Sequence, residues 1–228
     1  MDFDFNLPDN YGLSTPKKEL VIPENSDTVV LHCCCAPCST AVLECLLAYN
    51  IKPVLFFFNP NIHPRGEYEK RRDEWLHLAE LTHVEAVIGD YETKNWFEKV
   101  KGLEHCPERA ERCDECFYMR LKATALLAKE RNIKVFTTTL ATSRWKSKQQ
   151  VDRAGFRAQQ EVADSIYWDM DWRKGGLVER RYKLVKEIGF YNQRYCGCVY
   201  SMQSALAQNK AANKEELMRS SLEKNYDK

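Results

Sequence analysis

The sequence predicts an α/β fold built on a parallel sheet, followed by a mainly helical C-terminal part. Two observations indicate this class. Short apolar runs alternate with stretches of helical length, a pattern typical of a parallel sheet with helices on both faces. The run at residues 53–58 is continuously apolar, as expected of a strand that is covered on both sides.

The elements follow in order along the chain. Strands are predicted at residues 28–33, 53–58, 84–88 and 133–139, where apolar and β-branched residues cluster. Helices are predicted at residues 40–49, with Ser39 as the N-cap, and at residues 66–82 and 116–131. Beyond residue 139 the chain is expected to be helical and basic.

The chain of 228 residues is predicted to have three regions. Residues 1–26 contain Pro8, Pro16 and Pro23 with little periodicity and are expected to be an irregular N-terminal arm. Residues 27–207 are expected to form a single α/β catalytic domain with a helical C-terminal part. Residues 208–228 are charged, poor in apolar residues and expected to be a polar tail.

Composition points to the cytoplasm. The N-terminus lacks the features of a signal peptide, and no apolar run approaches the roughly 18 residues needed to span a membrane. The ten cysteines are therefore expected in a reducing compartment, where clustered thiols hold metals or perform redox chemistry more often than they form structural disulfides.

The net charge is only +1, but it is unevenly distributed. Residues 144–194 contain 12 Lys and Arg against 7 Asp and Glu, a local charge of +5. This segregation predicts a basic surface on a nearly neutral protein, suited to a nucleic-acid partner.

Seven cysteines form three tight groups. They are Cys34, Cys35 and Cys38; Cys113 and Cys116; and Cys196 and Cys198. Thiolates are soft ligands for iron–sulfur clusters and zinc, and a four-thiolate site needs only two of the groups. The spacing of the middle pair suits zinc and iron–sulfur equally, whereas adjacent cysteines in the first group favour a cluster. The third group is not needed as a metal ligand, and a Cys-x-Cys pair beside a metal centre indicates redox chemistry.

The other cysteines and the histidines have simpler interpretations. Cys33 and Cys45 are expected to be buried as small apolar side chains, and Cys106 to be a plain thiol. His32 and His63 fall near the ends of predicted strands and are expected to be hydrogen-bonded parts of the structure. The same interpretation applies to His105.

Three loops are expected to line one crevice, because ligands of open parallel sheets bind beyond the carboxyl ends of the strands. These are residues 33–38, 59–63 and 137–142. The order of elements resembles the adenine-nucleotide hydrolase-like (HUP-like) proteins. Their first loop cradles phosphate, but here that loop has no glycine for close backbone approach. ATP use is therefore not expected.

Several motifs together resemble the cobalamin-independent epoxyqueuosine reductases, the QueH family. They are Cys34-Cys35-Ala36-Pro37, the run from Phe58 to Pro64 with Glu67, Tyr68, Arg71 and Arg72, Gly102 to His105, Arg112-Cys113-x-x-Cys116, Thr137 to Leu140, Arg173-Lys174-Gly175 and Tyr195-Cys196-Gly197-Cys198. The resemblance covers about residues 28–202. It implies reduction of epoxyqueuosine to queuosine at the wobble position of tRNA, with electrons from an external donor.

The same resemblance implies site roles. The ligands of a 4Fe-4S cluster map onto Cys34, Cys35, Cys113 and Cys116, and a redox-active pair maps onto Cys196 and Cys198. Some members have Asp where this chain has Cys38. The resemblance thus implies a second metal ion near Cys38, with iron as the candidate. Because this chain has Cys at that position, the identity of the metal stays open.

The chemistry expected of such a reaction agrees with the residues. Removing an epoxide oxygen to leave an alkene needs two electrons, which a cluster or a dithiol can supply. Candidate substrate-binding residues lie in the crevice loops and in the basic stretch: Asn59, Asn61, Arg144, Lys146, Arg173 and Lys174. Trp145 offers a stacking surface for an extruded base.

Two other functions fit parts of the pattern. One is a structural zinc module that binds nucleic acid without chemistry, and the absence of colour in the purified protein would distinguish it. The other is a general thiol–disulfide oxidoreductase that uses Cys196 and Cys198. Their one-residue spacer differs from the Cys-x-x-Cys typical of thioredoxin-like proteins.

Overall fold

A computed structural model of the protein describes residues 20–226, with side chains as far as Asn213. It contains a five-stranded sheet in the order β3-β2-β1-β4-β5, and every pairing is parallel. The strands are β1 (Thr28–His32), β2 (Lys52–Phe57), β3 (Ala86–Ile88), β4 (Val135–Thr138) and β5 (Ile166–Tyr167). The predicted α/β class with a parallel sheet is confirmed, and the strand order is consistent with a HUP-like core. Two-residue β5 was missed because so short a run carries no periodicity.

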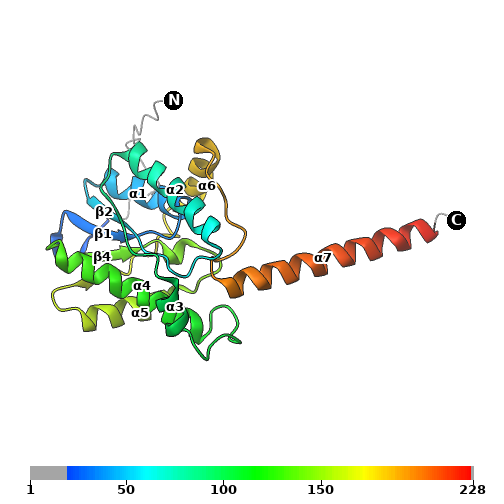
Figure 1. The fold of residues 1–228 in the computed structure, drawn as a ribbon. Coiled ribbons are helices and arrows are strands. Elements are labelled where there is room, and N and C mark those ends of the chain that lie inside the picture. Colours follow the sequence, from blue (N-terminus) through cyan, green and yellow to red (C-terminus); the bar gives the residue numbers. More distant parts are fainter. Residues whose placement is uncertain (1–19, 227–228) are drawn as a thin grey trace.

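Helices cover both faces of the sheet (Figure 1). One layer contains α1 (Ala36–Ala48), α2 (Arg65–Thr82) and α6 (Leu177–Ile188), and the other contains α3 (Thr93–Lys99), α4 (Glu111–Glu130) and α5 (Lys148–Glu161). Short 3-10 helices, η1 (Pro23–Asn25) and η2 (Leu140–Thr142), precede β1 and follow β4. α3 was not predicted, and α4 begins five residues earlier than expected.

Strand side chains divide between two cores because successive residues of a strand point to opposite faces. Val29 and Leu31 of β1 pack with α1, α2 and α6, whereas Val30 packs with α4 and α5. All three are fully buried. This explains why the strands read as continuous apolar runs in the sequence.

The start of α1 differs from the prediction. Ser39 was expected to cap a helix beginning at residue 40, but α1 begins at Ala36 with Cys35 as its N-cap. Ser39 lies inside the helix, and its hydroxyl donates to the carbonyl of Cys35 at 2.8 Å. Pro37 permits the earlier start, because a proline in the first helical turn removes an N–H that would have had no partner. Cys38 is consequently a helical residue.

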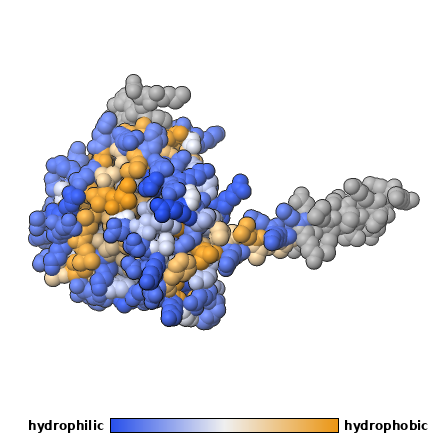
Figure 2. All heavy atoms as spheres, viewed as in Figure 1, coloured by the Kyte–Doolittle hydropathy of each residue, from blue (hydrophilic) through white to orange (hydrophobic). Residues whose placement is uncertain are grey.

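The last helix, α7 (Val199–Tyr226), extends away from the body as a single rod (Figure 1). The predicted boundary between residues 207 and 208 falls inside it. Of the predicted N-terminal arm, residues 1–19 lie outside the described residues, and η1 occupies part of the remainder. No helix in the described part of the chain is long and apolar enough to cross a membrane. In the view of Figure 2 the body is mainly hydrophilic, with apolar residues gathered in patches.

Candidate metal and redox site

The site lies where the chain order in the sheet reverses, between β1 and β4. Cys33 extends β1 by donating its N–H to the carbonyl of Phe56 at 2.8 Å. The next residue, Cys34, turns toward β4, and its N–H donates to the hydroxyl of Thr139 at 3.4 Å. Crevices at such switch points are the usual ligand sites of open parallel sheets. The loops after β1 and β4 therefore meet as predicted.

Three thiols converge at this point. The sulfur atoms of Cys34, Cys35 and Cys38 all lie within 4.8 Å of one another, and all three residues are buried. Cys35 and Cys38 stand at the N-cap and the third residue of α1, a spacing that places both on one side of the helix start. Gln193 joins the group from a distant loop, since its Nε2 donates to Cys35 Sγ at 3.1 Å and to Cys38 Sγ at 3.8 Å.

Charge in the group concentrates on one sulfur. Hydrogen bonds from Cys35 and Cys38 hold the pKa of Cys34 well below its usual range. The hydrogen bond to Cys34 correspondingly raises the pKa of Cys38 to about 11, while burial raises the pKa of Cys35. Cys34 is therefore the first of the three to become a thiolate, and the helix N-terminus beside it favours negative charge.

A buried lysine supplies the opposing charge. Lys146 is only 5% exposed. Burial alone would lower its pKa, but the attraction of Cys196, Cys34 and Cys38 in their negatively charged thiolate form outweighs burial and raises the pKa. Lys146 was predicted to contact substrate phosphate at the surface, whereas the structure places its ammonium among the cysteines.

Cys113 and Cys116 lie on the first two turns of α4, outside the group of three thiols. Cys113 is half-buried against the core that contains that group, and burial raises its pKa to about 12. Cys116 packs in a small cluster with Trp96 and Cys198. The middle cysteine pair thus lies between the first cysteine group and the last.

The Cys196–Cys198 loop is held by α2. Arg71, buried and ion-paired with Glu67 at 2.6 Å, donates to the carbonyls of Tyr195 at 3.2 Å and Cys196 at 3.0 Å. The N–H of His63 donates to the carbonyl of Gly197 at 2.8 Å. These contacts fix the backbone of the loop. Neither of its two thiols forms a disulfide, both residues are half-buried, and Cys198 Sγ accepts from the N–H of Ser201 at 3.4 Å.

Gly197 is required by the backbone of this loop. Its φ is +138°, and a Cβ at this position would lie 3.1 Å from Arg71 Nη1 and 3.2 Å from the side chain of Ile62. An L-residue is strained at such a φ. The glycine between the two cysteines therefore allows the loop to pack directly against α2.

A pocket of about 130 Å³ reaches this site from the surface. One wall is Cys38 with Gln193, and the other wall is basic and aromatic. That wall includes Arg144, Trp145, Arg181 and Tyr182. The guanidinium of Arg144 lies 5.1 Å from the centre of the Trp145 ring. A flat heteroaromatic ring with polar edges fits such a lining.

The predicted substrate-binding residues divide between interior and surface. Asn59 is 1% exposed and is used internally: it donates to the carbonyl of Cys33 at 2.9 Å and accepts from Arg120 at 3.3 Å. Asn61 is also buried, with its Oδ1 unpaired within the described part of the protein. Arg173 is exposed and paired with Asp171 at 3.1 Å. Lys174, also exposed, lies with it in the turn before α6.

The histidines differ in burial, and the remaining cysteines are buried. Burial lowers the pKa of His32 to about 3, so it is neutral. It hydrogen-bonds to Thr138 at 2.9 Å and to the carbonyl of Phe58 at 3.2 Å, which is a structural role. His105 is exposed. The side chains of Cys33, Cys45 and Cys106 are buried.

Two residues of the site were not identified from the sequence. Gln193 touches two of the thiols, and Arg181 lines the pocket from α6. Neither residue type marks a metal or redox site by itself. The only available indication for Gln193 was its position three residues before Cys196.

The donor set fits a soft metal or an iron–sulfur cluster. Three of its thiols converge, those of Cys34, Cys35 and Cys38, and Cys113 packs on the same core. A buried cation, Lys146, opposes the negative charge that thiolate ligands bring. Thiolate ligation of this kind is shared by zinc and iron–sulfur sites.

Comparison with known proteins gives one family. The model of the epoxyqueuosine reductase QueH family matches residues 29–204. A protein named epoxyqueuosine reductase QueH from Acinetobacter baylyi is 46% identical over 191 residues, covering 84% of this chain and 88% of its own length. Proteins of the same name from Histophilus somni and Haemophilus influenzae are each 42% identical, covering 89% and 83% of this chain and 82% and 77% of their own lengths.

Proposed function

Because this chain belongs to the epoxyqueuosine reductase QueH family, we propose that it reduces epoxyqueuosine to queuosine at the wobble position of tRNA. One observation carries the proposal beyond the family match. The pocket between Arg144 and Arg181 ends at Cys38, one of three converging buried thiols. A nucleobase that enters this pocket comes directly to the sulfur group.

We propose that Cys34, Cys35, Cys113 and Cys116 hold a 4Fe-4S cluster. The location of Cys113 against the core of the first cysteine group supports this set, as does the low pKa of Cys34, because only thiolates bind iron. A bound cluster would supply electrons singly. Cys38, beside the pocket, is the candidate ligand of a second metal ion, an iron.

The chain's own thiols can balance the reaction. If Cys196 and Cys198 form the redox pair, their two thiols lose two electrons and two protons and become a disulfide. The epoxide takes up the two electrons and the two protons, its two C–O bonds break, and the products are an alkene and water. An external electron donor must then reduce the disulfide before the next turnover. The packing of Cys198 beside Cys116 supports electron transfer between the pair and the cluster.

Nucleoside analysis of tRNA tests the function. Cells that lack this protein and any other such reductase are expected to accumulate epoxyqueuosine. The wild-type chain should clear it, and so should the Cys106→Ala variant, whose thiol lies outside the proposed site. The Cys198→Ala variant should not. Normal queuosine in the cells without the protein would refute the proposed function.

Metal analysis tests the cluster independently of activity. Anaerobically purified wild-type protein is expected to be brown and to contain iron and sulfide. The Cys113→Ser/Cys116→Ser double variant should lose the absorbance, whereas Cys106→Ser should retain it. A colourless wild-type protein that contains zinc would instead support a structural zinc site.

A further inference from the structure

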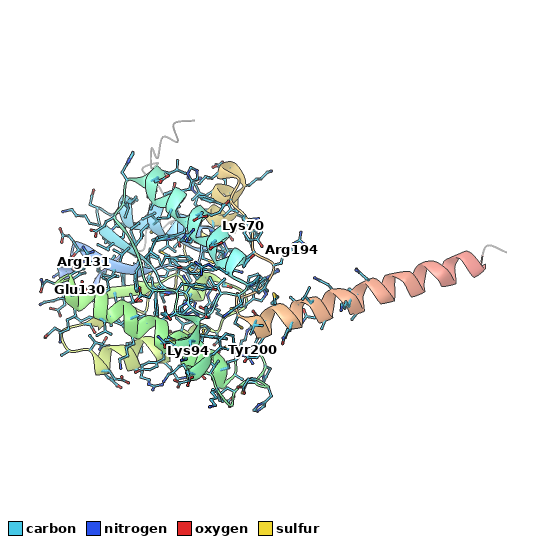
Figure 3. All side chains as sticks on the ribbon, viewed as in Figure 1. Lys70, Lys94, Glu130, Arg131, Arg194 and Tyr200 are labelled. Atoms are coloured by element: carbon cyan, nitrogen blue, oxygen red, sulfur yellow. The ribbon has the colours of Figure 1, made fainter. Side chains whose placement is uncertain are left out.

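A second groove continues the pocket outward to α7. It encloses about 420 Å³ and shares four lining residues with the pocket, namely Arg144, Trp145, Asn192 and Gln193. Its far side is formed by Arg194 and by α7, through Ala205, Gln208 and Asn209. Figure 3 shows Arg194 on the segment that leads into α7. We call this feature the α7 groove.

The charge of the α7 groove is entirely positive. Arg144 and Arg194 line it, and no acidic residue does. Both arginines are exposed, and neither forms an ion pair with a described carboxylate, unlike Arg173 with Asp171. Two unpaired guanidinium groups beside an aromatic ring form a surface suited to a polyanion that also carries stacking bases.

The base of α7 is fixed to the body, so the groove has a defined width. Tyr200, on the first turn of α7, lies under the guanidinium of Arg112 at 4.5 Å, and its ring centre is 6.1 Å from that of Trp96. Gln208 and Asn209 follow two turns later and are exposed. They lie on the same side of the helix as Ala205, because residues three and four apart face the same way.

We propose that the α7 groove binds the RNA strand next to the nucleoside that enters the pocket, with α7 as its outer wall. Arg144 and Arg194 contact the phosphodiesters, Trp145 stacks with a neighbouring base, and the amides of Gln208 and Asn209 donate to phosphate or ribose oxygens. This rests on the proposed function, and it assigns α7 a part in binding the tRNA substrate.

A matched pair of variants on α7 tests the proposal. Gln208→Glu places a carboxylate in the groove, whereas Gln203→Glu makes the same change at an exposed position of the same helix that does not line the groove. Both variants should fold normally. Gln208→Glu is expected to weaken tRNA binding on the order of tenfold at low salt, with the difference shrinking at high salt because salt screens exposed charges. Gln203→Glu should bind as the wild type does.

The salt dependence of binding provides a second measurement. Each phosphate contact with single-stranded nucleic acid contributes about 0.7 to the slope of log affinity against log salt. Arg194→Gln is therefore expected to reduce the slope by about this amount, and Arg173→Gln, outside the groove, to reduce it less. Equal tRNA affinity for Gln208→Glu and Gln203→Glu would overturn the proposal. The same result is expected if the groove binds an acidic protein and not RNA.

The two proposals fail in different ways. If the wild-type chain reduces epoxyqueuosine in tRNA but Gln208→Glu and Gln203→Glu bind equally, the groove assignment is wrong and the function stands. If Gln208→Glu alone weakens tRNA binding but no reduction occurs, the groove assignment stands and the proposed reaction is wrong.

Discussion

At the scale of single residues, Gln193 connects the pocket with the sulfur group. It is 8% exposed, its Nε2 donates to two thiols, and its Oε1 has no partner among the described residues. A buried polar atom without a partner is costly. We expect this oxygen to accept a hydrogen bond from a donor group on the substrate.

Replacing Gln193 with Leu should lower kcat/KM by about tenfold, because leaving a buried polar partner without its hydrogen bond costs about 1–3 kcal/mol. Gln150→Leu is the matched control. Gln150 is 5% exposed and also has an unpaired Oε1, but it does not line the pocket. Steady-state kinetics and thermal unfolding of both variants provide the comparison. Equal activity losses would show that Gln193 has only a structural role.

Gly197 makes a second prediction at this scale. Gly197→Ala should destabilise the fold by about 1–3 kcal/mol, because the residue adopts a φ of +138° and its new Cβ would press on Arg71 and Ile62. Gly66→Ala, near the start of α2 with open space around the new Cβ, should be neutral or slightly stabilising. Denaturant unfolding measures both changes. A neutral Gly197→Ala would contradict the described loop conformation.

At the scale of elements, α1 and α2 perform different tasks. The early start of α1 brings Cys35 and Cys38 onto one side of the helix. α2 holds the Cys196–Cys198 loop, because Arg71 reaches from its second turn to the carbonyls of Tyr195 and Cys196. Two helices of one layer thereby hold the first and last cysteine groups.

Removing the guanidinium of Arg71 should therefore be costly. Arg71→Met leaves Glu67, whose side chain is 11% exposed, with the Tyr191 hydroxyl at 3.1 Å as its remaining partner. It also leaves two loop carbonyls without a donor, and breaking a buried pair in this way costs about 3–5 kcal/mol. Arg65→Met removes a surface pair with Glu69 on the same helix and should cost less than about 0.5 kcal/mol. Urea unfolding curves test the difference. Similar losses in the two variants would refute the anchoring role of Arg71.

At the scale of the whole molecule, α7 is the element that departs from the body. Figure 1 shows its distal half with no other element beside it. A helix segment of this length is marginal on its own in water. The distal half should therefore contribute little to the stability of the α/β body.

Truncation after Asn213 is expected to remove helical circular dichroism while shifting the melting temperature by less than about 2 °C, which corresponds to under about 1 kcal/mol for a domain of this size. The truncated chain retains all the residues that line the α7 groove, so its tRNA affinity should also be retained. A fall of more than about 5 °C would show that the distal half of α7 packs against another surface, such as a second copy of the chain.

The sequence by itself determined four of the five strands of the sheet and the grouping of the cysteines. Both are local properties: a continuous apolar run is visible in a window of six residues, and the spacing within each cysteine group is read directly from the chain. Because parallel strands share one carboxyl edge, the meeting of the loops after β1 and β4 could be predicted as well.

Tertiary structure alone decided which side chains complete the site. Lys146 appeared to be one of many surface cations, yet it is buried among the thiols, and Gln193 carried no recognisable motif. Their roles depend on contacts between segments more than one hundred residues apart. Such contacts depend on how the helices pack on the sheet, and no local sequence pattern encodes that packing. The burial of a side chain and the charge around it are set by all its neighbours in space, and only the folded chain brings those neighbours together.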